Sequence, residues 1–258
     1  MLFDSHAHLD DERFDEDREA IIEGLHGREI SYVLNAGADL PSSQRAIALS
    51  EKYDFIYASV GIHPHDAINM KDNDLDTLAD MARQPKVVAI GEIGLDYHYD
   101  NSPRQIQKDR FAQQLELSAK VGLPVIIHDR EAHEDILDII KAHKSILNRG
   151  VLHCYSGSWE LAKIFIDLGF YISLAGPVTF KNSAKAVEVA QNIDMNYLMI
   201  ETDSPYLTPH PYRGQRNDSG MVKLVAERIA ELRGMDVSEV ARITLENACN
   251  LFGIGKDS

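Results

Sequence analysis

The chain has 258 residues, of which 44% are hydrophobic and 26% charged, a composition that is ordinary for a soluble globular protein. Its 41 acidic and 26 basic residues give a net charge of −15, which disfavours long-range, non-specific attraction to nucleic-acid phosphates. Two cysteines are too few for a disulfide framework, and the sequence shows neither a signal-peptide pattern nor a run of about 18 apolar residues. We therefore expect a cytoplasmic protein that does not span a membrane.

Short apolar runs predict strands, and apolar residues at helical spacing predict the helices between them. In chain order, the strands are expected at residues 2–8, 30–34, 55–60, 87–90, 125–127, 150–152, 170–174 and 198–200. The helices are expected at residues 14–25, 41–52, 72–83, 103–121, 133–143, 159–168, 184–192, 221–233 and 237–252. The strands are continuous apolar runs, as is typical of a parallel sheet that is covered on both faces.

This alternation predicts an α/β fold, namely a single (β/α)₈ TIM barrel with one domain over residues 1–258. No Gly/Ser-rich linker divides the chain, and a barrel of this class typically has about 250 residues. A doubly wound open sheet is the alternative, because the number of strands does not show whether the sheet closes. In a barrel the carboxyl ends of the strands share one face, and we expect the functional site on that face.

Side chains of the metal-ligand type follow five of the predicted strands. His6 and His8 lie on the same side of an extended strand, because strand side chains alternate. The whole set comprises His6, His8, Glu92, His128, His153 and Asp203. Imidazole and carboxylate groups together suit Zn²⁺, Mn²⁺ or similar ions. The sequence therefore predicts a metal site at the carboxyl ends of the strands.

Six ligands exceed what one structural zinc ion takes, so two ions are expected. In the simplest partition, His6, His8 and Asp203 surround one ion. His128 and His153 then surround the other, and Glu92 bridges the two. The competing interpretation is that these are ordinary polar residues at strand ends.

Six short motifs surround these residues. They are Asp4-Ser5-His6-Ala7-His8-Leu9, Gly61-Ile62-His63-Pro64-His65, Gly91-Glu92-Ile93-Gly94-Leu95-Asp96-Tyr97, His128-Asp129-Arg130, His153-Cys154-Tyr155-Ser156-Gly157 and Glu201-Thr202-Asp203-Ser204-Pro205-Tyr206-Leu207. Together, and in this order, they resemble the TatD family of metal-dependent deoxyribonucleases, which belongs to the amidohydrolase superfamily. The resemblance extends from residue 2 to about residue 253.

The resemblance implies divalent ions, usually two, held by the same six residues, with Zn, Mn and Mg left open. It also implies a nuclease whose substrate is DNA. One departure from the family pattern is the run after the last strand. The family usually carries Arg-Asn-Glu-Pro there, whereas Arg216-Asn217 is followed here by Asp218-Ser219-Gly220. This change leaves the fit of the substrate at that edge open.

The expected reaction is hydrolysis of a phosphodiester by a metal-activated water. Two ions about 3.5–4 Å apart bind the phosphate charge and lower the pKa of a bridging water. We expect Glu92 to be the bridging ligand, and Asp203 to be both a metal ligand and the general base. A recessed barrel mouth suits single strands or DNA ends better than the middle of a duplex.

Four further residues are predicted to contact the substrate. His63 and His65 follow the third strand, while Arg213 and Arg216 lie beyond the eighth. Guanidinium groups suit phosphate oxygens and supply local positive charge that the composition as a whole lacks. The run Asp96-Tyr97-His98-Tyr99 offers aromatic faces on which a base can stack, and packing in the core or at the rim is an explanation of at least equal weight.

Two other functions fit the same residues. A hydrolase of a small phosphoester, lactone or cyclic amide would use the same metal site, because the fold hosts many chemistries. A non-enzymatic, metal-stabilised scaffold is less favoured, since a structural site is normally closed by four ligands. No membrane and no obligate protein partner is expected.

Overall fold

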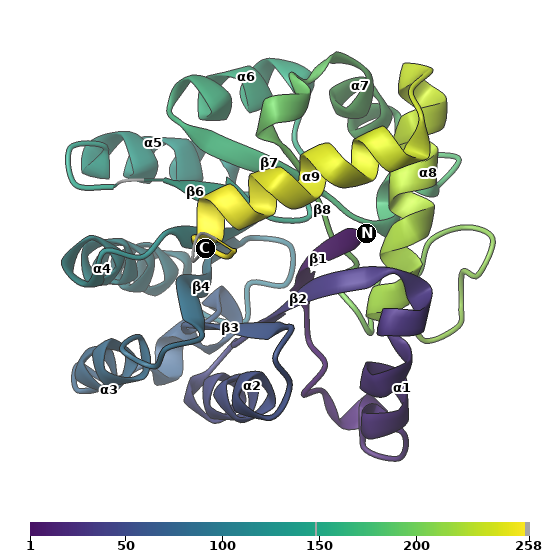
Figure 1. The fold of residues 1–258 in the computed structure, drawn as a ribbon. Coiled ribbons are helices and arrows are strands. Elements are labelled where there is room, and N and C mark those ends of the chain that lie inside the picture. Colours follow the sequence, from purple (N-terminus) through teal and green to yellow (C-terminus); the bar gives the residue numbers. More distant parts are fainter. Residues whose placement is uncertain (148, 256–258) are drawn as a thin grey trace. The chain divides into compact units, whose positions relative to one another are not determined.

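The computed structural model describes residues 1–147 and 149–255. Within them, eight strands form one sheet in the order β1 to β8 (Figure 1). The strands are β1 (Leu2–Ala7), β2 (Ile30–Ala36), β3 (Ile56–Val60), β4 (Val87–Asp96), β5 (Val125–Arg130), β6 (Gly150–Leu152), β7 (Phe170–Leu174) and β8 (Leu198–Ile200). The helices are α1 (Arg18–Gly24), α2 (Leu40–Lys52), α3 (Asp74–Met81), α4 (Arg104–Val121), α5 (His133–His143), α6 (Trp159–Asp167), α7 (Ala184–Asn192), α8 (Val222–Arg233) and α9 (Val237–Phe252).

Consecutive strands pair in parallel. The register is defined for β1 with β2, β3 with β4, β4 with β5, β5 with β6, and β7 with β8. Ala7 of β1 also forms a parallel bridge with Ser204, four residues beyond the end of β8. This sequential parallel order is that of a (β/α)₈ barrel. The single domain over residues 1–258 stays a prediction, and residues 148 and 256–258 lie outside the described part of the chain.

The chain divides into two compact units, of which the first comprises Met1–Asn35, Cys154–Asp167 and Tyr171–Ser258. Here α9, drawn in yellow in Figure 1, packs against β1 and β8. The ring of Phe3 on β1 lies 6.0 Å from that of Phe252 on α9, measured between centroids. Both rings are buried, and burial of such a side chain contributes about 1.5–3 kcal/mol. This packing fixes the strand that carries His6.

The second unit comprises Ala36–His153 and Leu168–Phe170. Every residue of β4 is buried, and α4 packs against this strand. Two buried glutamine side chains of α4 form hydrogen bonds with backbone groups near the ends of β3 and β4. Gln107 accepts the N–H of Asp96 at 2.8 Å and donates to its carbonyl at 3.1 Å. Gln114 does the same for Ile62, at 2.8 and 3.0 Å. Helix α4 therefore positions the segments that follow β3 and end β4.

The elements differ from the predicted ones mainly at two boundaries. Strand β4 continues to Asp96 instead of ending near residue 90, because residues 93–96 pair with residues 127–130 of β5. Helix α1 begins at Arg18 and not near residue 14. The Asp11 side chain accepts the Arg13 N–H and starts a separate 3₁₀ turn over Glu12–Phe14. Among the described residues, no helix combines the length and the apolar character needed to cross a membrane.

Candidate metal centre

In the first unit, the segment after β8 is fastened to β1 by hydrogen bonds. The buried Asp4 carboxylate accepts the Thr202 N–H at 2.8 Å and the Thr202 hydroxyl at 2.6 Å. The N–H of Asp203 donates to the carbonyl of His6 at 2.9 Å, and the N–H of His8 donates to that of Ser204 at 2.8 Å. These bonds hold Asp203 in a left-handed conformation with a φ of 56°. Burial of Asp4 raises the pKa of its carboxyl group to about 7.

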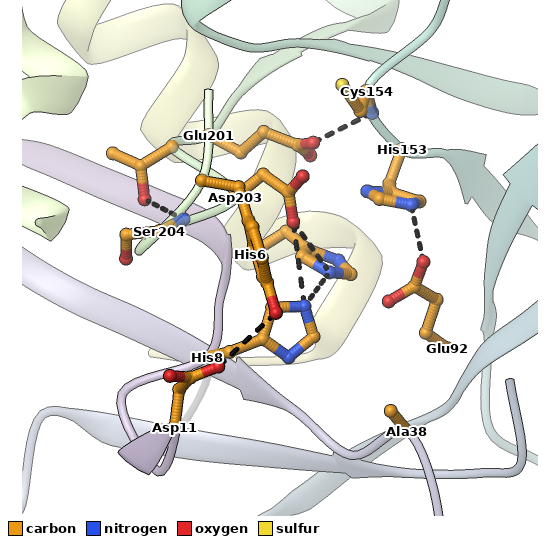
Figure 2. Close-up of polar contacts among 12 residues, drawn as sticks. His6, His8, Asp11, Ala38, Glu92, His153, Cys154, Glu201, Asp203 and Ser204 are labelled. Atoms are coloured by element: carbon orange, nitrogen blue, oxygen red, sulfur yellow. Dashed lines mark hydrogen bonds and ion pairs between the residues drawn. The ribbon is translucent and has the colours of Figure 1, made fainter. Parts of the chain in front are cut away.

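This arrangement brings together three of the predicted ligands, which we call the first ligand group: His6, His8 and Asp203. The two Nε2 atoms are 3.2 Å apart. Asp203 Oδ1 lies 3.8 Å from His6 Nε2 and 3.5 Å from His8 Nε2. Figure 2 shows the three side chains turned toward one another. The alternation of β1 therefore places both imidazoles on one side, as the sequence predicts.

In the second unit, Glu92, His128 and His153 form the second ligand group. Glu92 Oε1 lies 2.7 Å from His128 Nδ1 and 2.8 Å from His153 Nε2 (Figure 2 shows the latter contact). The two imidazole nitrogens are 3.3 Å apart. Strand pairing produces this convergence, because Gly94 of β4 lies opposite His128 of β5 and the His153 N–H donates to the carbonyl of Ile127.

Both groups have the chemistry and the spacing of a divalent-ion site. Donor atoms about 2.1 Å from one ion lie about 3.4 Å from each other in a tetrahedron. The nitrogen and oxygen atoms within each group are separated by 2.7–3.8 Å. Each group joins two imidazoles to one carboxylate, the donors that borderline ions prefer. The residues present therefore fit the predicted cofactor, while the bridging role of Glu92 stays a prediction.

His63 lies beside the second ligand group and not apart from it. Its Nδ1 accepts the His65 N–H at 3.1 Å, so a neutral ring carries its hydrogen on Nε2. That Nε2 lies 3.3 Å from Glu92 Oε1. Burial lowers the pKa of His63 to about 4, which keeps the ring neutral. His63 is thus placed to donate a hydrogen bond to Glu92, and its contact with a substrate stays a prediction.

Asp96 is a member of this cluster that the sequence analysis did not assign. Its buried Oδ2 lies 3.1 Å from His128 Nε2 and 2.9 Å from His65 Nε2. Burial alone raises the pKa of Asp96, but hydrogen bonds from His128, Tyr99 and His65 lower it well below its ordinary value. The carboxylate accepts from Nε2 of His128 and leaves Nδ1 to the ligand group. Glu92 and Asp96 are four residues apart on β4, so the alternation of the strand places both acids on one side.

Gly94, between these two acids, is required by the close approach of β5. A Cβ atom at this position would overlap the carbonyl oxygen of His128, and the φ of 145° strains any other residue. We expect Gly94→Ala to lower the free energy of unfolding by roughly 3 kcal/mol. Denaturant unfolding measures this change. Gly24→Ala is the control, because nothing lies within 4 Å of a Cβ there. Equal unfolding midpoints for the two variants would show that the packing of β4 against β5 accommodates a Cβ atom at residue 94.

The two predicted arginines have different surroundings. Arg216 donates to the carbonyl of Arg13 and to Asp17 Oδ2, both at 2.6 Å, and its guanidinium lies over the ring of Phe14. The bond to Asp17 raises the pKa of Arg216. This arginine therefore fastens residues 13–17 to the segment after β8. Arg213 is exposed, with its guanidinium carbon 4.0 Å from the ring centroid of Phe180. Contact of either arginine with a substrate stays a prediction.

Asp218, where the chain departs from the family pattern, has a structural role. Its Oδ1 accepts the N–H of Gly220 at 2.8 Å and lies 2.7 Å from Nη1 of Arg28. It thereby caps the 3₁₀ turn over Ser219–Met221 that leads into α8. Asp218, at the position of the family's usual glutamate, thus starts this turn without the proline that follows in the family pattern.

Comparison with known proteins gives the same assignment as the motifs. The sequence profile of TatD-related DNases matches residues 3–253. The uncharacterized metal-dependent hydrolase YabD of Bacillus subtilis is 49% identical, and the alignment covers 98% of this chain and all of YabD. A protein of Salmonella typhimurium, named 3′-5′ ssDNA/RNA exonuclease TatD, is 33% identical over 98% of this chain and 99% of its own length.

A solved structure supports the fold as well as the family. The crystal structure of YJJV, a TatD homolog from Escherichia coli K12, superposes with a TM-score of 0.92 at 31% identity, covering 98% of each chain. The predicted (β/α)₈ barrel is thereby confirmed. The relatives named as metal-dependent hydrolases, together with groups of histidine and carboxylate side chains spaced to hold a metal ion, support a metal-dependent hydrolase. The chain belongs to the family of TatD-related DNases.

Proposed function

We propose that this metal-dependent hydrolase is a deoxyribonuclease that cleaves phosphodiester bonds of DNA, in single strands or at strand ends. The observation that carries the proposal is the pair of ligand groups, each with two imidazoles and one carboxylate. The Salmonella relative named as an exonuclease supports a nucleic-acid substrate. We further propose that the first group holds one divalent ion and the second group another.

The charge of the chain is consistent with a substrate held locally. A net charge of −15 repels a phosphate backbone at long range, and this repulsion favours short or single-stranded ends over long duplexes. Positive charge near the site would come from the bound ions and from exposed arginines such as Arg213. His63 and His65 remain candidates for contacts with the phosphate oxygens.

The side chains divide the chemical work between them. When bound, divalent ions would neutralise the phosphate charge and lower the pKa of a water molecule. Asp203, in the first ligand group, accepts the proton of the water that attacks phosphorus. The new P–O bond forms while the bond to the leaving sugar oxygen breaks, and that oxygen takes a proton from solvent. Asp96 and His63 hold His128 and Glu92 in place through the hydrogen bonds described above.

Removal of the metal tests the proposal directly. We expect EDTA-treated protein to cleave end-labelled single-stranded DNA at least about 100-fold more slowly, because each ion contributes several kcal/mol to the stability of the transition state. Addition of Mg²⁺, Mn²⁺ or Zn²⁺ in excess should restore cleavage. A denaturing gel of the labelled products measures the rate and shows whether cleavage begins at an end.

Two other outcomes would point to the competing functions. Metal-dependent hydrolysis of bis(4-nitrophenyl) phosphate or of a lactone, without cleavage of DNA, would favour a small substrate. Unfolding of the protein by EDTA, followed by circular dichroism, would favour a metal-stabilised scaffold. We expect the EDTA-treated protein to stay folded, since the apolar core of each unit does not include the ligand groups.

A further inference from the structure

An exposed aromatic ring lies beside the second ligand group. Tyr99, in the loop after β4, is 56% exposed although its ring has three neighbours. The ring of His65 approaches it edge-on at 5.4 Å and that of His98 at 4.9 Å, measured between centroids. The guanidinium carbon of Arg130 lies 4.8 Å from the centre of the Tyr99 ring. The exposed part of this ring is therefore accessible to a ligand beside the second ligand group.

The position of Tyr99 is fixed by Asp96. One carboxylate oxygen of Asp96 accepts the N–H groups of His98 and Tyr99, at 3.0 and 2.9 Å. Its other oxygen binds His65 and the ligand His128. A single buried carboxylate therefore joins the loop that carries the ring to the histidine of the metal centre. The ring is held in place before any substrate arrives, and a preorganised surface loses little entropy on binding.

Arg130 is fixed to the same loop from the neighbouring strand. It ends β5 opposite Asp96, and its carbonyl accepts the N–H of Tyr97 at 2.9 Å. The Arg130 side chain is exposed, and no carboxylate pairs with it among residues 1–147 and 149–255. Its positive charge is therefore available to an anion from outside.

The first unit contains a similar pair that lacks this property. Tyr206 is 44% exposed and lies edge-on to His8, with Arg13 over its ring. The guanidinium of Arg13, however, donates to both oxygens of Asp11, at 2.9 and 3.1 Å. Asp11 also bonds the Tyr206 hydroxyl at 3.3 Å. This pair is neutralised within the protein, so we assign anion binding to the pair in the second unit.

We infer that Tyr99 and Arg130 form a nucleotide subsite that binds a base and a phosphate of a single strand next to the bond that is cleaved. The base stacks on the exposed part of the Tyr99 ring, and the guanidinium of Arg130 binds a phosphate oxygen. Stacking accepts every base, so the subsite selects unpaired nucleic acid without sequence preference. This inference rests on the proposed function and adds the part of the substrate that the subsite recognises.

Four variants test the subsite. Tyr99→Ala removes the ring, and Tyr99→Phe keeps its face. Arg130→Ala removes the cation, and Lys163→Ala is the matched control, because Lys163 lies over the ring of Trp159 on α6. The probe is a labelled thymidine oligonucleotide, whose binding is followed by fluorescence anisotropy in the metal-loaded protein carrying Asp203→Asn. The same substitutions in otherwise unchanged protein are assayed with bis(4-nitrophenyl) phosphate, whose hydrolysis reports whether the metal centre is still active.

We expect Tyr99→Ala to weaken oligonucleotide binding on the order of 10-fold, with Tyr99→Phe close to the parent. Arg130→Ala should reduce the slope of log affinity against log salt by about 0.7, whereas Lys163→Ala should not change it. Hydrolysis of the small diester should match the parent in Lys163→Ala and should persist in the other three variants, which shows that their metal centre is active. An oligonucleotide without its terminal base should bind the parent as weakly as the intact one binds Tyr99→Ala, and the two losses should not add.

Unchanged oligonucleotide affinity in both Tyr99→Ala and Arg130→Ala would overturn the subsite while the deoxyribonuclease activity stands. If removal of the terminal base and Tyr99→Ala each lower the oligonucleotide affinity and the two losses add, the stacking part of the inference is overturned. If the unsubstituted protein hydrolyses the small diester but neither binds nor cleaves DNA, the proposed function itself fails. The three results are therefore distinguishable.

Discussion

Replacement of Asp203 by Asn is expected to leave the protein folded and to lower kcat for DNA cleavage by roughly 10²- to 10⁴-fold, the contribution of a well-placed general base. Asparagine is nearly the same size and adopts a left-handed conformation readily, so it tolerates the φ of 56° at this position. The bond from its N–H to the carbonyl of His6 is retained. What the substitution removes is the charge beside His6 and His8 and the ability to accept a proton.

The measurement combines turnover of labelled DNA at saturating metal with the midpoint of thermal unfolding. Asp236→Asn serves as the control, because Asp236 caps α9 through the N–H of Ser238 and asparagine caps a helix equally well. This control should match the parent in both turnover and stability. Parental turnover in Asp203→Asn would remove Asp203 from the reaction. A large loss of stability would show that the aspartate is needed for the fold instead.

The second large effect is expected at Asp96, which touches the ligand His128 without joining the ligand group. We expect Asp96→Ala to weaken metal binding by about 10- to 100-fold, because the imidazole loses the partner that orients it and fixes its hydrogen on Nε2. Titration calorimetry with Mn²⁺ or Zn²⁺ measures this loss. Asp96→Asn keeps one acceptor oxygen for four donors, so its effect should be smaller than that of alanine but in the same direction.

Stability must be measured separately at this position, because Asp96 also anchors the loop of Tyr99. Loss of several buried hydrogen bonds should lower the free energy of unfolding by about 3–5 kcal/mol, even in the presence of EDTA. Asp135→Ala is a matched control in the same unit. Asp135 bonds the hydroxyl of Tyr97 and pairs with Lys108 near the surface, where such a pair contributes about 1 kcal/mol or less. Metal affinity in Asp96→Ala equal to that of this control would exclude an orienting role.

Much of the fold could be predicted from the sequence, because each strand is a short apolar run that ends in polar residues. The histidines at or just beyond the carboxyl ends of β1, β5 and β6 could be identified for the same reason. The end of β4 could not be predicted, because the buried acids Glu92 and Asp96 interrupt its apolar run. Histidines from other segments stabilise both acids, and two backbone N–H groups also stabilise Asp96. A one-dimensional pattern does not contain these partners.

The roles of the arginines show a second limit. Arg216 resembles a substrate contact in sequence, yet its guanidinium bonds to Asp17, 199 positions away. Arg130, which follows His128 and Asp129 in the sequence, has no carboxylate partner among the described residues. In the sequence, charge alone did not distinguish Arg216, which is paired within the protein, from Arg130, which is not. The ion pairs of the folded chain do separate them.

The bonds between Asp4 and Thr202 join residues that are 198 positions apart. On the ribosome, the donors of the second ligand group have all been synthesised once residue 153 is added, whereas the first group must wait for residue 203. At about 5–20 residues per second, translation needs roughly 3–10 s for the intervening stretch. A chain released in that interval therefore carries all three donors of the second ligand group but lacks Asp203 of the first.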